Sequence, residues 1–272
     1  MPMRRFALTL AGRTLALVLG FGLFLGGAPG SGAQEASHGT APFWDTLFWS
    51  FTTGFDFSRG DYGLNRDSTL YYVPVGVTVD RDRLRLRIVL PFLVSEGPTA
   101  VGAAGGPVPQ SESNSGFGEI TTSGSYVFDP VAKGFPFIEL GGQVTAPTRS
   151  KNELGTGEWA FTPRIDFFEK VGPFSPFASA GRTFFTSLQS DSLDDRFFAS
   201  VGGSLELTEG VDVGVSYDWL EATNGAFPDA HEIVPFLSVR ASKAWTLSPY
   251  AVFGLSDASP DYGFGFGVRF AP

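Results

Sequence analysis

Charged and aliphatic side chains alternate along residues 83–90, where the sequence reads Arg-Leu-Arg-Leu-Arg-Ile-Val-Leu. A period of two is that of a β-strand, because successive side chains point to opposite faces of a sheet. One face of this segment suits water and the other suits an apolar medium. Segments of the same kind recur from residue 44 to residue 270, so the sequence predicts an all-β protein.

The first residues have the layout of a secretory signal peptide. Arg4 and Arg5 form a positive n-region, residues 14–25 form an apolar h-region, and residues 26–34 are a stretch of small residues suited to cleavage. The apolar run is shorter than the roughly 20 residues that a transmembrane helix needs. We therefore expect residues 1–34 to be removed after export.

The composition agrees with export and argues against several functions. The chain has no cysteine, so neither a disulfide framework nor thiolate chemistry is available. Three of the 19 basic residues and none of the 28 acidic residues lie within residues 1–34, so cleavage changes the formal charge from −9 to −12. We expect no nucleic-acid partner, because that needs a basic footprint. The 35 glycines and 28 phenylalanines suit β-structure with tight turns and interfacial rings.

Twelve candidate strands follow a short periplasmic tail at residues 35–43. Their faces are clean from Val211 to Trp219, where aliphatic and aromatic residues alternate with aspartate, glycine and serine. We expect residues 44–272 to form one domain, a transmembrane antiparallel up-and-down β-barrel of about twelve strands, with ten or fourteen as alternatives. The candidate strands are 44–58, 68–80, 83–95, 116–128, 135–147, 158–170, 174–186, 196–207, 211–221, 232–241, 245–255 and 262–270.

The connections between these strands alternate in length. Outer-membrane barrels have short periplasmic turns and longer extracellular loops, and an even strand count puts both chain ends in the periplasm. A soluble β-sandwich or lipocalin-like barrel, which is the alternative fold, has no reason to sort its loops in this way. The short connections are 80–83, 129–134, 170–173, 208–210 and 242–244. The long connections are 59–67, 96–115, 148–157, 187–195, 222–231 and 256–261.

Aromatic residues and prolines mark the candidate strands in two further ways. Aromatic residues fall at both ends of the strands, which is the girdle pattern of membrane barrels. Each proline inside a strand removes a donor from the ladder, so we expect β-bulges or shifted strand ends there. The aromatic residues are Trp44, Phe128, Phe167, Trp245 and Phe270 at the predicted periplasmic ends, and Trp159 and Trp219 at the opposite ends. The prolines are Pro74, Pro91, Pro163, Pro176, Pro235 and Pro249.

Four segments after residue 114 carry a family resemblance. They are Ser115-Gly-Phe-Gly-Glu-Ile-Thr-Thr-Ser-Gly-Ser-Tyr, Glu139-Leu-Gly-Gly-Gln-Val-Thr-Ala-Pro-Thr, Leu154-Gly-Thr-Gly-Glu-Trp and Pro176-Phe-Ala-Ser-Ala-Gly-Arg-Thr-Phe. In these segments the chain resembles the phenol meta-pathway outer-membrane protein family, a group of transporters associated by name with the degradation of aromatic compounds. The resemblance covers more than half of the chain. It implies a barrel and the passage of a small or apolar compound, and it brings no catalytic residues.

Charged and polar residues at inward positions are the candidates for a site in the lumen. Twelve strands lie between the small barrels that side chains fill and the larger porins that hold an aqueous channel, so we expect a narrow bore. In one interpretation, which we favour for the individual residues, salt bridges brace the lumen and little passes. In the other, the lumen is a pore with an acidic wall and a basic wall that includes Arg85 and Arg87. The candidates are Arg85, Arg87, Glu119, Glu139, Gln143, Arg164, Asp166, Arg182, Glu206, Asp212, Asp218, Arg240 and Arg269.

The sequence gives little support for a catalytic site. A lipid hydrolase of the outer membrane needs a serine nucleophile beside a histidine base, and the cleaved chain offers only His38, in the tail, and His231, where a loop meets a strand. Adjacent strand residues point to opposite faces, so Glu232 is not placed to orient His231. No Gly-x-Ser-x-Gly elbow occurs in the sequence. We expect no enzymatic activity, no cofactor and no metal.

The sequence favours a passive channel or uptake protein for small molecules. A structural or interaction barrel with a blocked lumen is the first alternative, and a lipid-modifying enzyme is the second. The expected partners are outer-membrane lipid and lipopolysaccharide, the barrel-assembly machinery and a small-molecule cargo. The longest connection, residues 96–115, is rich in small, turn-prone residues with nothing to form an element of its own. We expect it to govern access to the lumen as a plug, or else to be a surface loop.

Overall fold

The computed structural model describes the strands of one barrel and most of their connections. Every regular element in the described part of the chain is a β-strand, and no helix there is long and apolar enough to cross a membrane. The predicted cleavage site, the tail at 35–43, Trp44 and His38 all lie outside the described residues. The described residues are 13–15, 24–26, 47–62, 66–101, 107–109, 113–132, 134–147, 156–186, 194–222 and 228–272.

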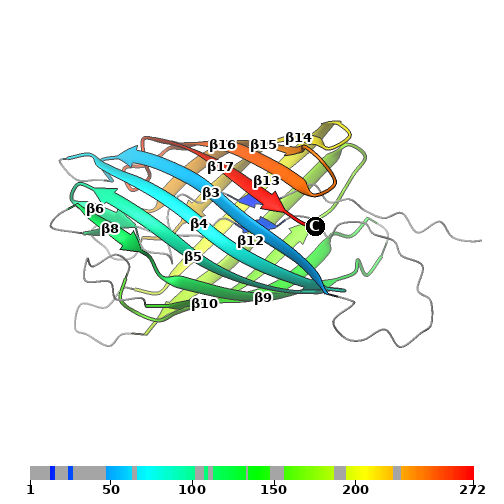
Figure 1. Ribbon diagram of the computed structural model, residues 1–272, viewed down its shortest axis with the longest axis horizontal. Coiled ribbons are helices and arrows are strands. Elements are labelled where there is room, and N and C mark those ends of the chain that lie inside the picture. Colours follow the sequence, from blue (N-terminus) through cyan, green and yellow to red (C-terminus); the bar gives the residue numbers. More distant parts are fainter. Residues whose placement is uncertain are drawn as a thin grey trace, which may run out of the picture.

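Thirteen strands pair antiparallel into one sheet that closes on itself (Figure 1). The ring closes where β3 (Phe48–Gly60) pairs with β17 (Tyr262–Phe270) on one side and with β4 on the other. Two short strands, β1 (Arg13–Leu15) and β2 (Phe24–Gly26), pair with each other and not with this sheet. The other barrel strands are β4 (Ser68–Arg81), β5 (Leu84–Glu96), β8 (Asn114–Phe117), β9 (Ile120–Phe128), β10 (Phe137–Ala146), β11 (Ala160–Phe168), β12 (Phe174–Phe185), β13 (Arg196–Thr208), β14 (Val211–Leu220), β15 (Ala230–Arg240) and β16 (Trp245–Gly254).

β8 and β9 are two parts of one interrupted strand. Both pair with β5, and Gly118 and Glu119 separate them. A Cβ atom on Gly118 would lie 2.2 Å from Leu93 Cδ1, so a larger residue at the interruption would require the Leu93 side chain to move. The predicted continuous strand 116–128 is therefore corrected to two segments. Counted as one, they give the barrel twelve strands, and the predicted up-and-down antiparallel barrel is confirmed.

The connection after β5 contains a short hairpin of its own. β6 (Thr99–Val101) pairs antiparallel with β7 (Pro107–Pro109). Gly97, with a φ of 113°, turns the chain out of β5 in a conformation that side chains rarely adopt. The expectation that residues 96–115 form no element of their own was therefore wrong. The role of this connection as a plug stays a prediction, and part of it lies outside the described residues.

One of the prolines inside the strands lies beside a register shift: β5 pairs with β8 in one register and, beyond Pro91, with β9 in a register shifted by one residue. Pro74 and Pro91 lie opposite each other in an unbroken register between β4 and β5. Around Pro235 and Pro249 the pairing of β15 with β16 lapses and then resumes in the same register. The expected bulge is therefore confirmed beside Pro91, and at the other five prolines the described register does not shift. A second described shift lies at the Glu206 end of β13.

Long and short connections lie at opposite ends of the barrel, as the sequence predicted. β4 and β5 are joined by the two residues 82–83, and β13 and β14 by residues 209–210. We call this the inner end; β3 begins and β17 ends there (Figure 1). The end with the longer connections is called the outer end. Trp159 at the outer end and Trp245 at the inner end expose 49% and 46% of their surface, which suits interfacial rings.

The two faces of the sheet follow the alternation in the sequence. In β5, Ile88 exposes 55% of its surface, whereas its neighbour Arg87 exposes 4%. Large apolar side chains occupy the outward face of the other strands as well. A contiguous apolar surface of this extent is costly in water and is the surface that lipid covers in membrane barrels. Further outward side chains are Leu140, Phe161, Val201, Val215 and Phe264.

Candidate functional site: the two walls of the lumen

The inward face of the barrel has two halves with different chemistry. We call the inward face of β3, β4, β5, β9, β10 and β11 the polar wall, because serine, threonine, arginine and acidic side chains dominate it. The inward face of β12 to β17 is called the aromatic wall, because Phe177, Phe198, Phe236 and Tyr250 lie on it beside glycines. Each wall consists of six consecutive strands of the ring.

Ion pairs between near neighbours satisfy several charges of the polar wall, whereas the buried Asp56 carboxylate of β3 has no described hydrogen-bond partner. Arg85 donates from Nε to Asp80 Oδ1 over 2.7 Å, and the two residues are direct partners across β4 and β5. Arg164 donates from Nε to Asp166 Oδ2 over 2.9 Å within β11. Because each pair is partly shielded from water, its hydrogen bonds are stronger than those of an exposed pair.

Three arginines of the polar wall and one of the aromatic wall lie close enough for their charges to interact. Arg87, from β5, is almost fully buried. Arg85, Arg164 and Arg269 lie close enough for their charges to repel the Arg87 guanidinium. These residues come from β5, β11 and β17, so the basic region predicted around Arg85 and Arg87 extends further than the sequence suggested.

Uncharged polar side chains fill the rest of this wall. Gln143 is buried and donates from Nε2 to Thr145 Oγ1 over 3.3 Å. At the edge of the wall, Thr162 Oγ1 lies 3.0 Å from Thr183 Oγ1 in a hydrogen bond between β11 and β12. Glu139 is half-buried and pairs across the ladder with Asp166. These groups give the wall a polar lining in which most side chains have protein partners.

Glu119 holds a loop at the outer end of the polar wall. Its Oε1 accepts hydrogen bonds from Thr156 N and Oγ1, both over 2.7 Å, and from Gly157 N over 3.2 Å. The neighbouring Glu158 carboxyl has one oxygen without a described partner, and burial raises its pKa. Glu119 therefore anchors the connection between β10 and β11, a role that its candidacy as a lumen residue did not anticipate.

The remaining predicted lumen residues divide between the inner end and the outside of the barrel. Lys170 and Glu206 form an ion pair near the inner end. Asp212 is buried on the inward face of β14, and Arg240 and Arg269 lie on inward positions at the inner ends of β15 and β17.

Arg182 is a correction to the predicted lumen set. Its guanidinium lies 5.0 Å from the Phe184 ring and 4.8 Å from the Phe197 ring, both of them outward-facing. The neighbouring Thr183 is fully buried, so the inward face of β12 falls on the odd-numbered residues. Arg182 thus lies on the outer surface near the outer end, where it also pairs with Asp195. The predicted inward position was wrong because contacts with the two rings allow the charged side chain to lie on the outward face.

The six described ion pairs do not cross the bore. Each joins residues on one strand, on neighbouring strands or on their adjoining connections. The pair of Arg83 with Asp129, for example, links two neighbouring turns at the inner end. These six salt bridges therefore brace the wall of the barrel along its circumference.

Aromatic side chains on the aromatic wall lie over glycines of the next strand. In each case the aromatic residue and the glycine are direct partners across the ladder. A Cβ atom on Gly265 would lie 2.1 Å from Tyr250 Cζ, and one on Gly214 would lie 2.2 Å from Phe236 Cζ. Glycine is therefore required for the rings to lie flat on the wall. The pairs are Phe177 with Gly202, Phe198 with Gly181, Phe236 with Gly214 and Tyr250 with Gly265.

These rings join into a continuous apolar surface. Phe177, from β12, and Phe236, from β15, reach across the two intervening strands to a ring separation of 6.3 Å. Val234 and Val252 extend the patch and are fully buried. We call this group, with Tyr250, the inner apolar patch.

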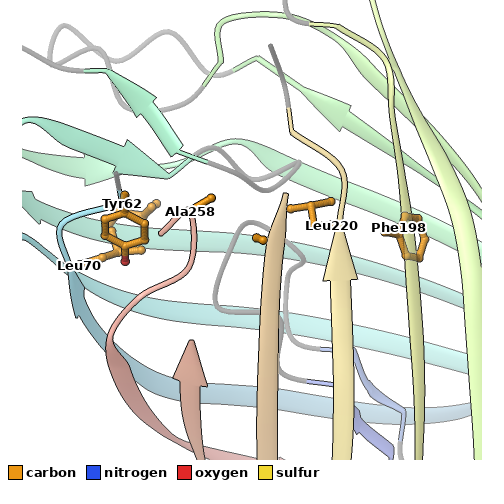
Figure 2. Close-up of a cluster of buried hydrophobic side chains, with 7 residues drawn as sticks. Tyr62, Leu70, Phe198, Leu220 and Ala258 are labelled. Carbon is orange, nitrogen blue, oxygen red and sulfur yellow. The ribbon is translucent and has the colours of Figure 1, made fainter. Parts of the chain in front are cut away.

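A second apolar group follows the outer rim. Tyr62 lies against Leu70 and Ala258, and the group continues past Leu220 to Phe198 (Figure 2). Tyr62 shares a hydrogen bond of 3.2 Å with Ser58, and burial raises the pKa of its phenol, so it stays neutral. We call this group the outer apolar band. Its buried members are Tyr62, Leu70, Leu93, Phe198, Leu220, Ala230 and Ala258.

Asp218 and Glu232 lie between the two apolar groups. Both side chains expose 1% of their surface, and the residues are direct partners across β14 and β15. Asp218 was among the predicted lumen residues, but Glu232 was not. The sequence signal that could have found it is the parity of β15, in which Ala230, Val234 and Phe236 share its buried face.

His231 lies on the other face of β15. Its Nδ1 is 2.6 Å from the hydroxyl of Tyr217, an outward residue of β14. Its backbone N–H donates to Ser259 Oγ over 2.9 Å. Its ring is not within hydrogen-bond distance of a serine hydroxyl in the part of the chain that the structure describes.

The fold and its walls define a class before any comparison is made. A closed antiparallel barrel of twelve strands, apolar outside and largely polar inside, is an outer-membrane type of β-barrel. Solved structures share this fold. The COG4313 outer membrane channel from Pseudomonas putida F1 superposes with a TM-score of 0.65 at 14% identity, covering 88% of this chain and 100% of that one. The KdgM porin gives a TM-score of 0.50 at 11% identity, covering 81% and 98%.

Sequence comparisons assign the family. Residues 68–271 match the family described as "Putative MetA-pathway of phenol degradation". The match spans well over half of the chain, so the protein belongs to that family. Among curated proteins, no sequence matches this chain.

Proposed function

We propose that this protein is a passive outer-membrane channel that admits small, mainly apolar molecules, including aromatic compounds. The family description names phenol degradation, and two proteins of similar fold are described as a channel and a porin. The assignment as a channel and not an enzyme belongs to this proposal.

The aromatic wall is the observation that carries the proposal. Rings packed over glycines form a buried apolar layer on the inward face of the barrel, and a lumen used only for ions or sugars gains nothing from it. An apolar solute gains free energy by leaving water for such a surface. The outer apolar band would receive the solute and the inner apolar patch would pass it on.

The distribution of ion pairs supports an open path over a blocked lumen. A lumen braced by salt bridges would show pairs between opposite walls. The described pairs connect neighbours only, so the basic residues of the polar wall and the rings of the aromatic wall remain two separate linings of one passage.

Location and partners follow from the same surfaces. The outward apolar face supports insertion in the bacterial outer membrane. Export by a cleaved signal peptide at 1–34, insertion by the barrel-assembly machinery, and contact with outer-membrane lipid and lipopolysaccharide are part of the proposal. Arg182, on the outer surface near the outer end, is a candidate contact for the phosphates of lipopolysaccharide.

Uptake by intact cells tests the function. The protein is expressed in Gram-negative cells that oxidise toluene, and oxygen consumption is recorded at a toluene concentration low enough for outer-membrane passage to limit the rate. We expect faster oxidation than in cells with the empty vector. An equal rate, with the barrel shown to be in the outer membrane, would contradict the proposal.

A matched pair of variants assigns the passage to a wall. Val234→Asn places an amide in the inner apolar patch, and Ser123→Asn places the same amide on an inward position of the polar wall. We expect Val234→Asn to slow toluene oxidation and Ser123→Asn to leave it close to wild type. Arabinose uptake serves as the polar comparison and should not fall in Val234→Asn.

A further inference from the structure

Two carboxylates stand side by side on the inward face of the aromatic wall. Asp218 of β14 and Glu232 of β15 are register partners, and each is about as buried as any polar residue of the barrel. Their neighbours two positions further out are Leu220 and Ala230, which belong to the outer apolar band. Val234, two positions further in, begins the inner apolar patch. The acidic pair therefore sits between two apolar surfaces.

Three oxygens of this pair have no hydrogen-bond partner among the described residues. They are both carboxylate oxygens of Glu232 and Oδ1 of Asp218, while Asp218 Oδ2 accepts from Ser216 Oγ over 2.9 Å. Neither residue takes part in a described ion pair. A buried carboxylate without a partner is destabilising, and a cation that donates hydrogen bonds to it removes that cost.

The chemistry of the surroundings selects the kind of cation. Calcium and magnesium take about six or more oxygen ligands, and the described residues form no cluster of three or more potential metal-binding side chains. An ammonium group has three N–H donors, which matches the three free acceptors. The apolar residues on both sides would hold a hydrocarbon or aromatic body attached to that group.

We propose that Asp218 and Glu232 form a binding site for small organic ammonium ions whose apolar body packs on the outer apolar band and the inner apolar patch. The inference deepens the proposed channel function, because the ligand reaches the site through the lumen. It adds a cationic class of ligand to the neutral apolar molecules that the aromatic wall alone would select.

Calorimetric titration of the refolded protein in detergent tests the site. The probes are phenethylammonium chloride and its neutral isostere phenethyl alcohol, which share the same apolar body. We expect wild-type protein to bind the ammonium at least about tenfold more tightly, the change that one charge-assisted hydrogen bond produces. Glu232→Gln and Asp218→Asn should each reduce this preference, and Glu232→Gln should abolish it.

Asp257→Asn is the matched control. Asp257 is an exposed residue of the β16–β17 connection at the same end of the barrel, so its substitution removes the same charge outside the site and should leave the preference intact. Heat-modifiable gel migration verifies that each variant is folded. Equal binding of both probes by wild type, a preference that survives both Glu232→Gln and Asp218→Asn, or displacement of the ammonium by magnesium chloride at similar concentrations would overturn the proposal.

Conductance in planar bilayers, recorded on the same preparations, separates the two proposals. Selective binding of the ammonium without conductance would retain the site and contradict the channel. Conductance without ammonium preference would retain the channel and contradict the site.

Discussion

The polar wall and the aromatic wall satisfy their side chains in different ways. On the polar wall the Arg85 guanidinium has the Asp80 carboxylate within 2.7 Å, and Gln143 has Thr145 as a partner. On the aromatic wall the large side chains lie on glycines, and the acidic residue Glu232 has no described hydrogen-bond partner. The polar wall satisfies most of its charges internally, although the buried Asp56 carboxylate has no described hydrogen-bond partner, whereas the aromatic wall combines buried rings with the unpartnered oxygens of Glu232 and Asp218.

This difference indicates where a ligand can bind in a barrel that is built only from β-strands. The backbones of all the strands pair in the same way, so the two walls differ only in the side chains at their inward positions. Internally paired groups mainly give rigidity, because a ligand would have to compete with an existing partner. Groups without partners are the ones that a ligand can stabilise.

The largest effect is expected where the two faces of β5 are exchanged. Ile88→Arg places a charge on the lipid face and should lower the free energy of unfolding by roughly 2–4 kcal/mol, whereas Arg87→Gln on the lumen side should cost much less. Reversible urea unfolding in lipid vesicles measures both. A larger loss for Arg87→Gln would mean that the register of the polar wall is shifted by one residue.

Replacing each of two glycines with alanine tests whether the rings of the aromatic wall lie over glycine. Gly265→Ala forces a Cβ into Tyr250 and should cost about 1–3 kcal/mol by overpacking. Gly142→Ala, in β10, meets its nearest neighbour at 3.5 Å and should be almost neutral. The same unfolding experiment compares them. If Tyr250→Ala fails to restore the stability of Gly265→Ala, the ring does not lie over that glycine.

Neutralising one acid on each wall should give opposite signs. Asp80→Asn removes the partner of Arg85 and should destabilise the barrel by about 1–3 kcal/mol, the range for hydrogen bonds to charged groups. Glu232→Gln removes a charge that has no described partner and should leave stability unchanged or raised. A comparable loss in both variants would show that Glu232 already has a partner and would remove the contrast between the walls.

The smallest effect is expected at the inner end, outside both walls. Arg83 and Asp129 form an ion pair whose side chains are 47% and 59% exposed. Exposed pairs contribute about 1 kcal/mol or less. Asp129→Asn should therefore change the free energy of unfolding only slightly, and the change should vanish in high salt. A loss as large as that of Asp80→Asn would indicate that exposure does not rank these ion pairs.

Most of the fold could be predicted from the sequence because the barrel obeys a period of two. The alternation around Arg87 and Ile88 gives the faces of β5, and the sorted connection lengths give the up-and-down topology. The register of β12 could not be predicted, since the aromatic contacts of Arg182 let a charged residue lie on the outward face. Which proline would lie beside a register shift could not be predicted either: Pro91 lies beside the shift between β8 and β9, whereas the register is unbroken around Pro74.

The site was less predictable than the fold. Charged residues at inward positions of the sequence include most of the polar wall and, on the aromatic wall, Asp212 and Asp218, but they give no sign of the rings that pack over glycines there. The sequence shows glycine at every second position at Gly263, Gly265 and Gly267, but it does not show which side chain fills the space above them. The Tyr250 ring lies over Gly265 because the two residues are partners across β16 and β17. This pairing depends on the register between two strands, which the sequence of either strand alone does not show.

Chemical blocking of each wall tests most directly whether solutes pass along the aromatic wall. The chain has no cysteine, so Ser216→Cys on the aromatic wall and Ser123→Cys on the polar wall each carry a single thiol. Both are modified with the same bulky thiol reagent in intact cells, and toluene oxidation is then recorded. We predict that modification slows oxidation in Ser216→Cys and much less in Ser123→Cys. Equal slowing at both positions, or a reagent that reaches neither thiol, would contradict a passage along the aromatic wall.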